Sequence, residues 1–320
     1  MKLLPRYLAL FLFTVLPLYA ADLSDLTYTA IGGEVTITDC DEAATGELII
    51  PDTIEGNTVT SIGNKAFHFC TSLTSIAIPD SVTSIRVTAF RNCTSLTSVT
   101  IGGSVTSIGP AAFDRCTSLT SITIPDSVTS IGSSAFDFCT SLTTIEVGAG
   151  NGNYAGYNGV LFNKEQTTLH TYPAGKTGGS YTIPDSVTSI EADAFQSCTS
   201  LTSISIGNGV TGIGEWAFAD CSSLTSFTIP DGVTSIGRAA FQSCASLTSI
   251  TIGNGVTNIG DFAFERCTSL TVLTFLGDAP KAGREVFSRG ATPTIYRKAE
   301  AKGWGETFAE RPVKLISKKP

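Results

Sequence analysis

Charged, histidine and methionine residues are scarce in this chain of 320 residues. It contains two histidines, one methionine and only 15% charged residues. An average soluble domain has roughly 25% charged residues, so the surface is expected to be neutral and rich in hydroxyl groups. The histidines, His68 and His170, belong to no Ser-His-Asp or Cys-His arrangement, and no phosphate-binding glycine loop or EF-hand loop occurs. These absences argue against an enzyme.

Basic residues are also in short supply, and some of them lie in a segment that resembles a signal peptide. Lys2 and Arg6 precede an apolar run at residues 8 to 16, which is too short to span a bilayer, and a cleavage site follows at residues 18 to 20. A retained N-terminal anchor is the alternative. Removing residues 1–20 leaves 18 basic and 28 acidic residues, a net charge of −10. That balance argues against nucleic acid and anionic membranes as partners.

A 23-residue repeat fills most of the chain. Its marker is Ala-Phe-x-x-Cys, and a period of 20 to 50 residues is typical of solenoids and arrays. The repeat predicts about ten stacked coils. The phenylalanines and cysteines of the marker, which we expect to form core ladders, are Phe67, Phe90, Phe113, Phe136, Phe195, Phe218, Phe241 and Phe264, with Cys70, Cys93, Cys116, Cys139, Cys198, Cys221, Cys244 and Cys267.

Each copy contains a strand, as the segment 119–124 illustrates. Leu119, Ile122 and Ile124 should point into the core, while the hydroxyl residues between them face solvent. A Pro or Gly turn follows, then a second apolar edge, then the Ala-Phe pair. The fold class is therefore a β-rich (α/β) leucine-rich-repeat solenoid, with a parallel sheet on one face and short helical or 3-10 turns opposite.

The ends and the middle depart from the repeat. Residues 1–20 are read as the signal peptide, 21–48 as an N-terminal β cap with a hairpin around Gly32-Gly33, and 49–275 as the solenoid. A long variant coil at 146–183 should hold strands at residues 160–162 and 168–172. Residues 276–320 are read as a degenerate repeat and a C-terminal cap, with a closing strand, a short amphipathic helix, and Trp304 covering the last core face.

The pattern L-x-x-I-x-I-P-x-x-V-x-x-I-G-x-x-A-F-x-x-C resembles the BspA-type leucine-rich repeats of microbial surface and secreted proteins. The variant coil (Tyr154, Gly159 to Lys164, Thr167 to Pro173) and the closing Thr294-Ile295-Tyr296 share the resemblance. It implies a repeat solenoid and extracellular binding or adhesion, with host or matrix proteins bound by some members. Arg86 and Glu191 depart from it, because each replaces a turn glycine.

The cysteines allow three interpretations. An even number of cysteines in a secreted chain suggests disulfides, but identical positions on stacked coils all point the same way, whereas a disulfide needs a specific geometry. Zinc sites need close pairs of ligands, which are absent. Buried thiols that act as small apolar groups are the preferred reading, with Cys40 outside the pattern. No metal or cofactor is expected.

A threonine follows the strand leucine in every regular copy. These residues are the candidate partner-binding face: Thr74, Thr97, Thr120, Thr143, Thr202, Thr225, Thr248 and Thr271. They could also reflect only β-propensity copied by duplication, or they could bind ice or carbohydrate. Variable aromatics near the Ala-Phe pair are a second candidate surface, although wedging between coils is their favoured role; they are Phe69, Phe138, Trp216 and Phe262.

The sequence thus predicts a secreted or cell-surface protein that recognises an extracellular protein or glycan as a monomer, without catalysis. A structural spacer without a ligand is the main alternative. The sequence does not identify the partner.

Overall fold

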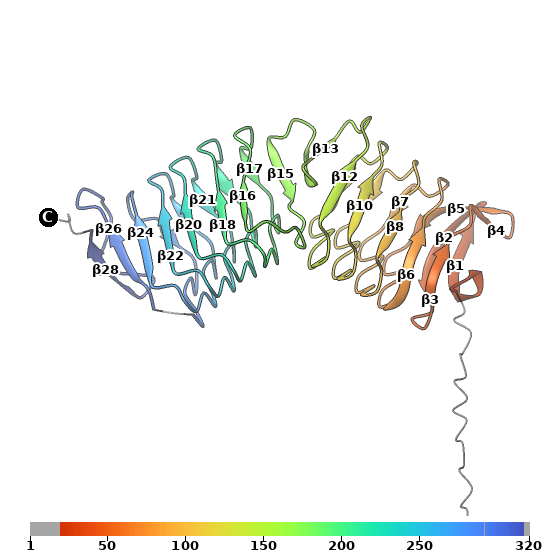
Figure 1. The fold of residues 1–320 in the computed structure, drawn as a ribbon, viewed down its shortest axis with the longest axis horizontal. Coiled ribbons are helices and arrows are strands. Elements are labelled where there is room, and N and C mark those ends of the chain that lie inside the picture. The colour runs from red at the N-terminus through yellow and green to blue at the C-terminus, as the bar shows by residue number, and fades with distance from the viewer. Residues whose placement is uncertain (1–19, 291, 317–320) are drawn as a thin grey trace, which may run out of the picture.

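The computed structural model describes residues 20–290 and 292–316, so the predicted signal peptide lies outside the described residues except for Ala20. About eleven coils stack along one axis, and the described part of the chain contains almost no helix beyond η1 (Leu23–Asp25). Figure 1 shows that the stack forms an arch, with its first coil and its last coil at opposite ends. The predicted class, a leucine-rich-repeat solenoid with parallel sheets, is confirmed.

One side of every coil contributes a strand to the main sheet. These strands are β3 (Thr45–Ile49), β6 (Ser72–Ala77), β8 (Ser98–Thr100), β10 (Ser121–Ile124), β12 (Thr144–Val147), β16 (Ser180–Thr182), β18 (Ser203–Ser205), β20 (Ser226–Ile229), β22 (Ser249–Ile252), β24 (Val272–Phe275), β26 (Thr294–Arg297) and β28 (Arg311–Leu315). Neighbours pair in parallel within four runs, β3-β6-β8, β10-β12, β16-β18 and β20-β22-β24-β26-β28, as Ile122 does with Ile145. Alternate residues are buried and exposed, as the sequence predicts.

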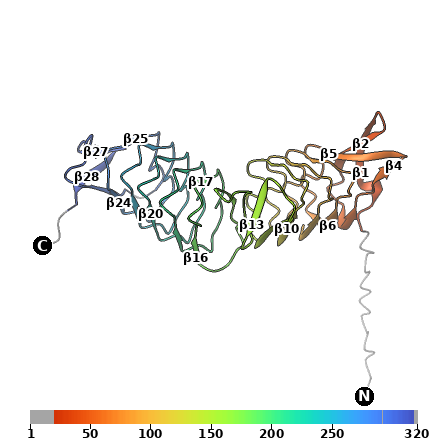
Figure 2. The ribbon, with the colours of Figure 1, turned by 90° about the horizontal axis from the view of Figure 1, so that it is seen from above.

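A second ladder of strands runs along the opposite side of the solenoid, as Figure 2 shows. It contains β2 (Glu34–Cys40), β5 (Asn57–Ile62), β7 (Ser84–Ile85), β9 (Ser107–Ile108), β11 (Ser130–Ile131), β15 (Thr168–Thr171), β17 (Ser189–Ile190), β19 (Gly212–Ile213), β21 (Ser235–Ile236), β23 (Asn258–Ile259) and β25 (Lys281–Ala282). Most of these strands have two residues, because each coil crosses this side only briefly.

Turns, and not helices, surround the Ala-Phe pair. The amide of His68 donates to the carbonyl of Lys65, and that of Cys70 to the carbonyl of Phe67. Lys65 and Phe69 have φ values of 62° and 66°, and equivalent residues of the other coils are also left-handed. A left-handed residue on each side of the pair prevents the turn from continuing as a helix.

The caps close the ends of the stack in different ways. The predicted N-terminal hairpin is present as β1 (Leu26–Ile31) and β2, joined at Gly32 and Gly33, whose φ values of 63° and 87° suit glycine. β4 (Thr53–Ile54) pairs back on β5.

The predicted C-terminal helix is wrong. Gly303, with φ of 76°, and Gly305 favour an irregular segment, and β27 (Thr307–Phe308) then pairs with β28. Trp304 does pack on the core, with its ring 4.8 Å from that of Phe275.

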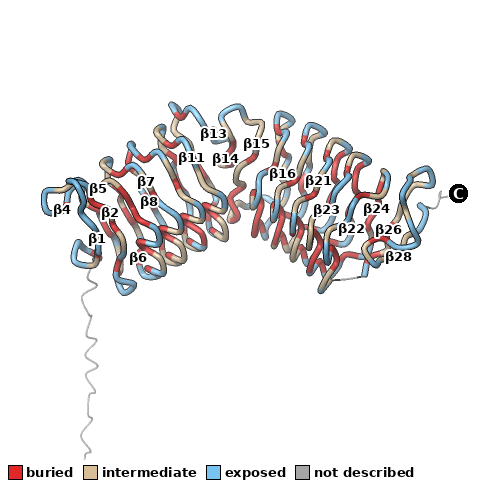
Figure 3. Tube along the Cα trace, turned by 180° about the vertical axis from the view of Figure 1, so that it is seen from behind, coloured by how far each residue is buried: buried red, intermediate tan, exposed pale blue. Residues whose placement is uncertain are grey.

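Phenylalanine rings stack through the interior as predicted. Consecutive rings are 4.9 Å apart for Phe67 and Phe90 and 5.2 Å apart for Phe218 and Phe241. Figure 3 shows that buried residues recur in every coil along the stack. The stack is interrupted after Phe136 and resumes at Tyr172, which occupies the phenylalanine position of the variant coil.

The variant coil separates two hydrophobic cores. It holds β13 (Tyr154–Tyr157), β14 (Val160–Asn163) and β15, so the two predicted strands are present. β14 is buried on both faces: Leu161 packs in the N-terminal core, while Val160 and Phe162 pack in the C-terminal core. Because strand residues alternate, this single strand forms a wall between the halves. The sheets of the N-terminal half end at β11 and β12.

Replacing a stacked ring tests the packing. Phe218→Ala should lower the free energy of unfolding by about 3–5 kcal/mol, because a large buried side chain leaves a cavity. Phe69→Ala is the matched control, since Phe69 is 46% exposed, and should cost about 1 kcal/mol or less. Urea unfolding followed by circular dichroism measures both, and equal losses would contradict the assigned packing.

Candidate binding surfaces

The predicted threonine face is exposed, but its hydroxyl groups, except that of Thr74, already donate hydrogen bonds within the chain. The Thr97 hydroxyl lies 2.8 Å from the carbonyl oxygen of Thr74, and that of Thr248 lies 3.0 Å from the carbonyl of Thr225. Equivalent bonds are made by Thr120, Thr143, Thr202, Thr225 and Thr271. Each carbonyl also accepts the amide of the same threonine. These threonines therefore hold neighbouring coils together.

A second threonine ladder, which the sequence reasoning missed, does the same on the other side of the solenoid. The Thr106 hydroxyl lies 3.1 Å from the Thr83 carbonyl, and the Thr234 hydroxyl lies 3.1 Å from that of Thr211. The repeated Val-Thr-Ser-Ile segment was the available signal, since it places a threonine beside the short strand of each coil.

Other hydroxyl groups of the main sheet are free, and they lie one and three residues after a threonine of the predicted face. Ser98, Thr100, Ser121 and Thr123 are exposed, and their side chains make no hydrogen bond to any described residue. Parallel strands are about 4.8 Å apart and alternate residues along a strand about 6.6 Å apart, so these groups form a flat, regular array. This array is the part of the main sheet that is open to a ligand.

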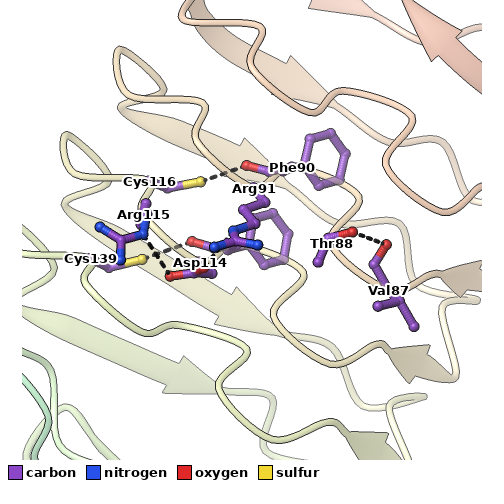
Figure 4. Close-up of polar contacts among 9 residues, drawn as sticks. Val87, Thr88, Phe90, Arg91, Asp114, Arg115, Cys116 and Cys139 are labelled. Carbon is purple, nitrogen blue, oxygen red and sulfur yellow. Dashed lines mark hydrogen bonds and ion pairs between the residues drawn. The ribbon is translucent and has the colours of Figure 1, made fainter.

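The nine cysteines are free and buried. Figure 4 shows the thiols of Cys116 and Cys139 directed at main-chain oxygens of preceding coils, and the Cys116 sulfur lies 3.1 Å from the carbonyl of Phe90. Burial raises the pKa of the Cys139 thiol, which suppresses its reactivity. Cys40 extends the ladder, because the Cys70 thiol contacts its carbonyl. Within the described residues, no group of three or more His, Cys, Asp or Glu could hold a metal ion.

Charged and aromatic side chains gather on the turn edge, which we define as residues 63–70, 86–93, 109–116, 132–139, 191–198, 214–221, 237–244, 260–267 and 283–290. Every arginine between residues 50 and 290 lies there. The four variable aromatics lie there too. Phe69 is exposed, whereas Phe138, Trp216 and Phe262 are half-buried.

Arginines flank three of these rings. The Arg115 guanidinium carbon lies 4.3 Å from the centre of the Phe138 ring. Arg238 lies 5.5 Å from Trp216 and 5.7 Å from Phe262, so one cation contacts two aromatic rings. Arginine and aromatic residues are enriched at protein interfaces.

The turn edge is interrupted at the variant coil. In the N-terminal half, the amides of Phe113 and Arg115 donate to Ala135 and Asp137 of the next coil. The next coil makes no such bonds from Ser134, Phe136 or Phe138 to any described residue. The halves are joined here by the Ser134 hydroxyl, which donates to a carboxylate oxygen of Asp193 at 2.7 Å.

A cleft of about 620 Å³ opens at this interruption, and we name it the central cleft. Its lining includes Arg91, Asp114, Arg115, Asp137, Phe138, Asp193, Gln196, Glu215 and Trp216. A smaller pocket of about 210 Å³ adjoins it and is lined by Ser134, Asp137, His170, Glu191 and Asp193 among others. The two halves of the solenoid contribute comparable numbers of these residues, although they are distant in sequence.

The carboxylates of the cleft are unevenly neutralised. Asp114 is ion-paired with Arg91 at 2.8 Å and lies 4.0 Å from Arg115 (Figure 4). Burial, followed by the nearby Asp193, raises the pKa of Asp137 to about 8. Burial also raises the pKa of Asp193. Burial therefore favours the uncharged form of these two carboxyl groups.

The smaller pocket does not form a catalytic triad. The Ser134 hydroxyl donates to Asp193 and not to His170. The His170 ring contacts the Thr171 hydroxyl at 2.9 Å and Glu191 at 3.6 Å, and burial lowers its pKa. A serine nucleophile would need a hydrogen bond to the histidine, and the Ser134 hydroxyl donates to Asp193 instead.

The fold and surfaces define a leucine-rich-repeat protein, and comparisons with known proteins specify the family. Residues 47–158 and 177–292 match the BspA type leucine rich repeat region, with six copies. The chain therefore belongs to the BspA-type leucine-rich-repeat family. A search of curated proteins found no match. No helix within the described residues is long and apolar enough to cross a membrane.

Similar solved structures come from bacteria. A leucine-rich cell surface protein from Faecalibacterium prausnitzii A2-165 is 25% identical, with a TM-score of 0.51, covering 81% of this chain and 93% of that chain. A leucine-rich repeat protein from Eubacterium ventriosum is 24% identical, with a TM-score of 0.55, covering 93% and 95%. The pneumococcal vaccine antigen PcpA is 21% identical, with a TM-score of 0.50, covering 87% and 93%. The last two support the fold alone.

Paired threonine substitutions test the role of the threonine ladder. Thr97→Val removes a hydroxyl that donates to the chain and should cost about 1 kcal/mol in the free energy of unfolding. Thr100→Val removes a free hydroxyl and should change it by about 0.5 kcal/mol or less. Thermal melts compare the two, and a larger loss in the Thr100 variant would contradict the assigned hydrogen bonds.

The raised pKa of Asp137 predicts a pH-dependent stability. A carboxyl group whose pKa is higher in the folded state favours the folded protein below its unfolded pKa of about 4, and this stability is lost as the pH rises toward about 8. Asp137→Asn should therefore raise the melting temperature at pH 8.5 and leave it nearly unchanged at pH 4. Glu146→Gln, an exposed change on the main sheet, is the control. An Asn variant that is less stable at pH 8.5 would contradict the raised pKa.

Proposed function

We propose that this chain is exported and acts at or near the cell surface as a non-catalytic scaffold that binds a partner protein. Three observations support the proposal. The chain belongs to a repeat family, one similar protein is described as a cell surface protein, and residues 1–20 resemble a signal peptide.

We assign the binding side by comparing the main sheet with the turn edge. The main sheet presents mostly serine and threonine, and the hydroxyls of its most regular threonine row are engaged between coils. The turn edge presents arginines, half-buried aromatics and a cleft. Tryptophan, tyrosine and arginine dominate the binding energy of protein interfaces. We therefore assign partner binding to the turn edge around the central cleft.

Recognition of carbohydrate by the main sheet is a second candidate. The free hydroxyls of Ser121 and Thr123 and of their equivalents favour it, because they form a flat array with unused donors and acceptors. Ice binding would use the same array, whereas a spacer would use neither surface.

Variants of the two surfaces separate these functions. Trp216→Ala combined with Phe262→Ala should weaken capture of the native partner from culture medium or host matrix at least tenfold. Other coils already have alanine at this position, as Ala111 and Ala239, so both substitutions should be compatible with the fold. Thr123→Lys combined with Thr228→Lys should leave capture unchanged.

The opposite pattern would assign binding to the main sheet, and a glycan array would then identify the ligand. If the parent protein captures no partner saturably through either surface, the result would support a structural spacer. Export is tested separately by mass spectrometry of the native protein, which should begin at Ala21. A mature protein that begins at Met1 would contradict export through a cleaved signal.

A further inference from the structure

We propose that the central cleft binds a cationic nitrogen group, a guanidinium or ammonium, presented by an arginine or lysine side chain of the partner protein. The inference deepens the proposed function, because it names the partner chemistry that the turn edge recognises. It follows from the charge, the hydrogen-bonding demand and the aromatic surfaces of the cleft.

The cleft carries more negative charge than the chain neutralises. Its lining contains four carboxylates and two arginines. Both arginines lie beside one of these carboxylates, Asp114. Asp137, Asp193 and Glu215 form no ion pair with any lysine or arginine of the described residues. On the C-terminal side of the cleft, Asp193 and Glu215 therefore have no cation of the described chain beside them, and a carboxylate attracts a cation more strongly where water is partly excluded.

A buried acceptor in the same cleft lacks a donor. Gln196 is 9% exposed and lines the cleft, and its side-chain oxygen accepts no hydrogen bond from the described part of the chain. Buried polar atoms of folded proteins nearly always have a partner, so this oxygen points to a missing donor. A guanidinium has five N–H donors and an ammonium has three, and either can satisfy the oxygen and a carboxylate together. A bare metal ion supplies no N–H donor.

The aromatic residues of the cleft suit the same group. Phe138 and Trp216 line opposite halves. The chain already places a guanidinium over Phe138, because Arg115 lies 4.3 Å from the ring centre. A guanidinium group is planar and can stack flat on an aromatic ring, whereas a spherical inorganic cation cannot. The cleft volume of about 620 Å³ falls within the usual range of ligand sites, roughly 300–1,000 Å³.

Trp216 provides a direct readout. The chain has two tryptophans, and Trp304→Phe leaves Trp216 as the only one, at the cleft. We would titrate this variant of the full chain with a blocked tri-arginine peptide, a tri-lysine peptide and a tri-citrulline peptide, which has the shape of arginine without its charge. The arginine and lysine peptides should shift the fluorescence saturably, and the citrulline peptide should require at least tenfold higher concentration.

Substitutions assign the signal to the cleft. Asp193→Asn, Glu215→Gln and Gln196→Ala should each weaken binding of the arginine peptide severalfold, and the first two together should weaken it at least tenfold. Ala219 already occupies the position of Gln196 in the next coil, and Glu215 is exposed, so these variants should fold. Glu146→Gln on the main sheet is the matched control and should bind as the parent does.

Binding should also tighten as the pH rises from 6 to 9. Asp137 loses its proton over this range, and the groups that face it are Asp114, Arg115, Asp193, Glu191 and His170. Asp137→Asn should reduce this dependence.

Defined outcomes overturn the proposal. Equal affinity for the citrulline peptide, unchanged binding in the Asp193 and Glu215 double variant, or no saturable signal would each contradict a cation site. Methylguanidinium as effective as the peptide would identify a free small cation as the ligand instead of a protein side chain. Cation binding without capture of any protein would leave the cleft chemistry standing and contradict the proposed function.

Discussion

The structure depends on hydrogen bonds between main-chain groups of successive coils, repeated every 23 residues. Amides of the strands and of the turn edge donate to carbonyls of the adjacent coil, as Phe90 does to Ala112 at 2.7 Å. The cysteine thiols and threonine hydroxyls use carbonyls in the same way. A coil therefore satisfies its polar groups only when a neighbour is present, and the stack is stable while its single coils are not.

On the turn edge of the described residues, these bonds between coils stop at the variant coil. β14 fills both cores from a single strand, and the turn edge is left without its partner coil. The released space is lined by carboxylates, aromatics and an unpartnered amide oxygen. On the turn edge of the regular coils the equivalent amides donate to the next coil, and the cleft opens where those bonds stop.

The sequence predicted those features of the fold that depend on residues close together in the chain. The 23-residue step identified the solenoid, the phenylalanine and cysteine ladders, the N-terminal hairpin and the strands of the variant coil, because each depends on residues close in sequence. The cleft could not be predicted, because Ser134 and Asp193 meet only after the halves fold. The hydroxyl of Thr97 could not be assigned from sequence, since an exposed threonine can donate inward or outward. The C-terminal helix was wrong because glycines at 303 and 305 outweigh the amphipathic pattern.

Residue-resolved hydrogen exchange tests the interruption most directly. The amide of Phe113 donates to Ala135 at 2.8 Å, whereas that of Phe136, at the same position one coil later, has no acceptor in the described chain. The account predicts that Phe136 exchanges at least tenfold faster than Phe113, and that protection returns at Tyr172 and Phe195, because exchange requires an amide to be free of its acceptor. Equal protection at Phe113, Phe136 and Tyr172 would show an unbroken stack and contradict the division of the solenoid.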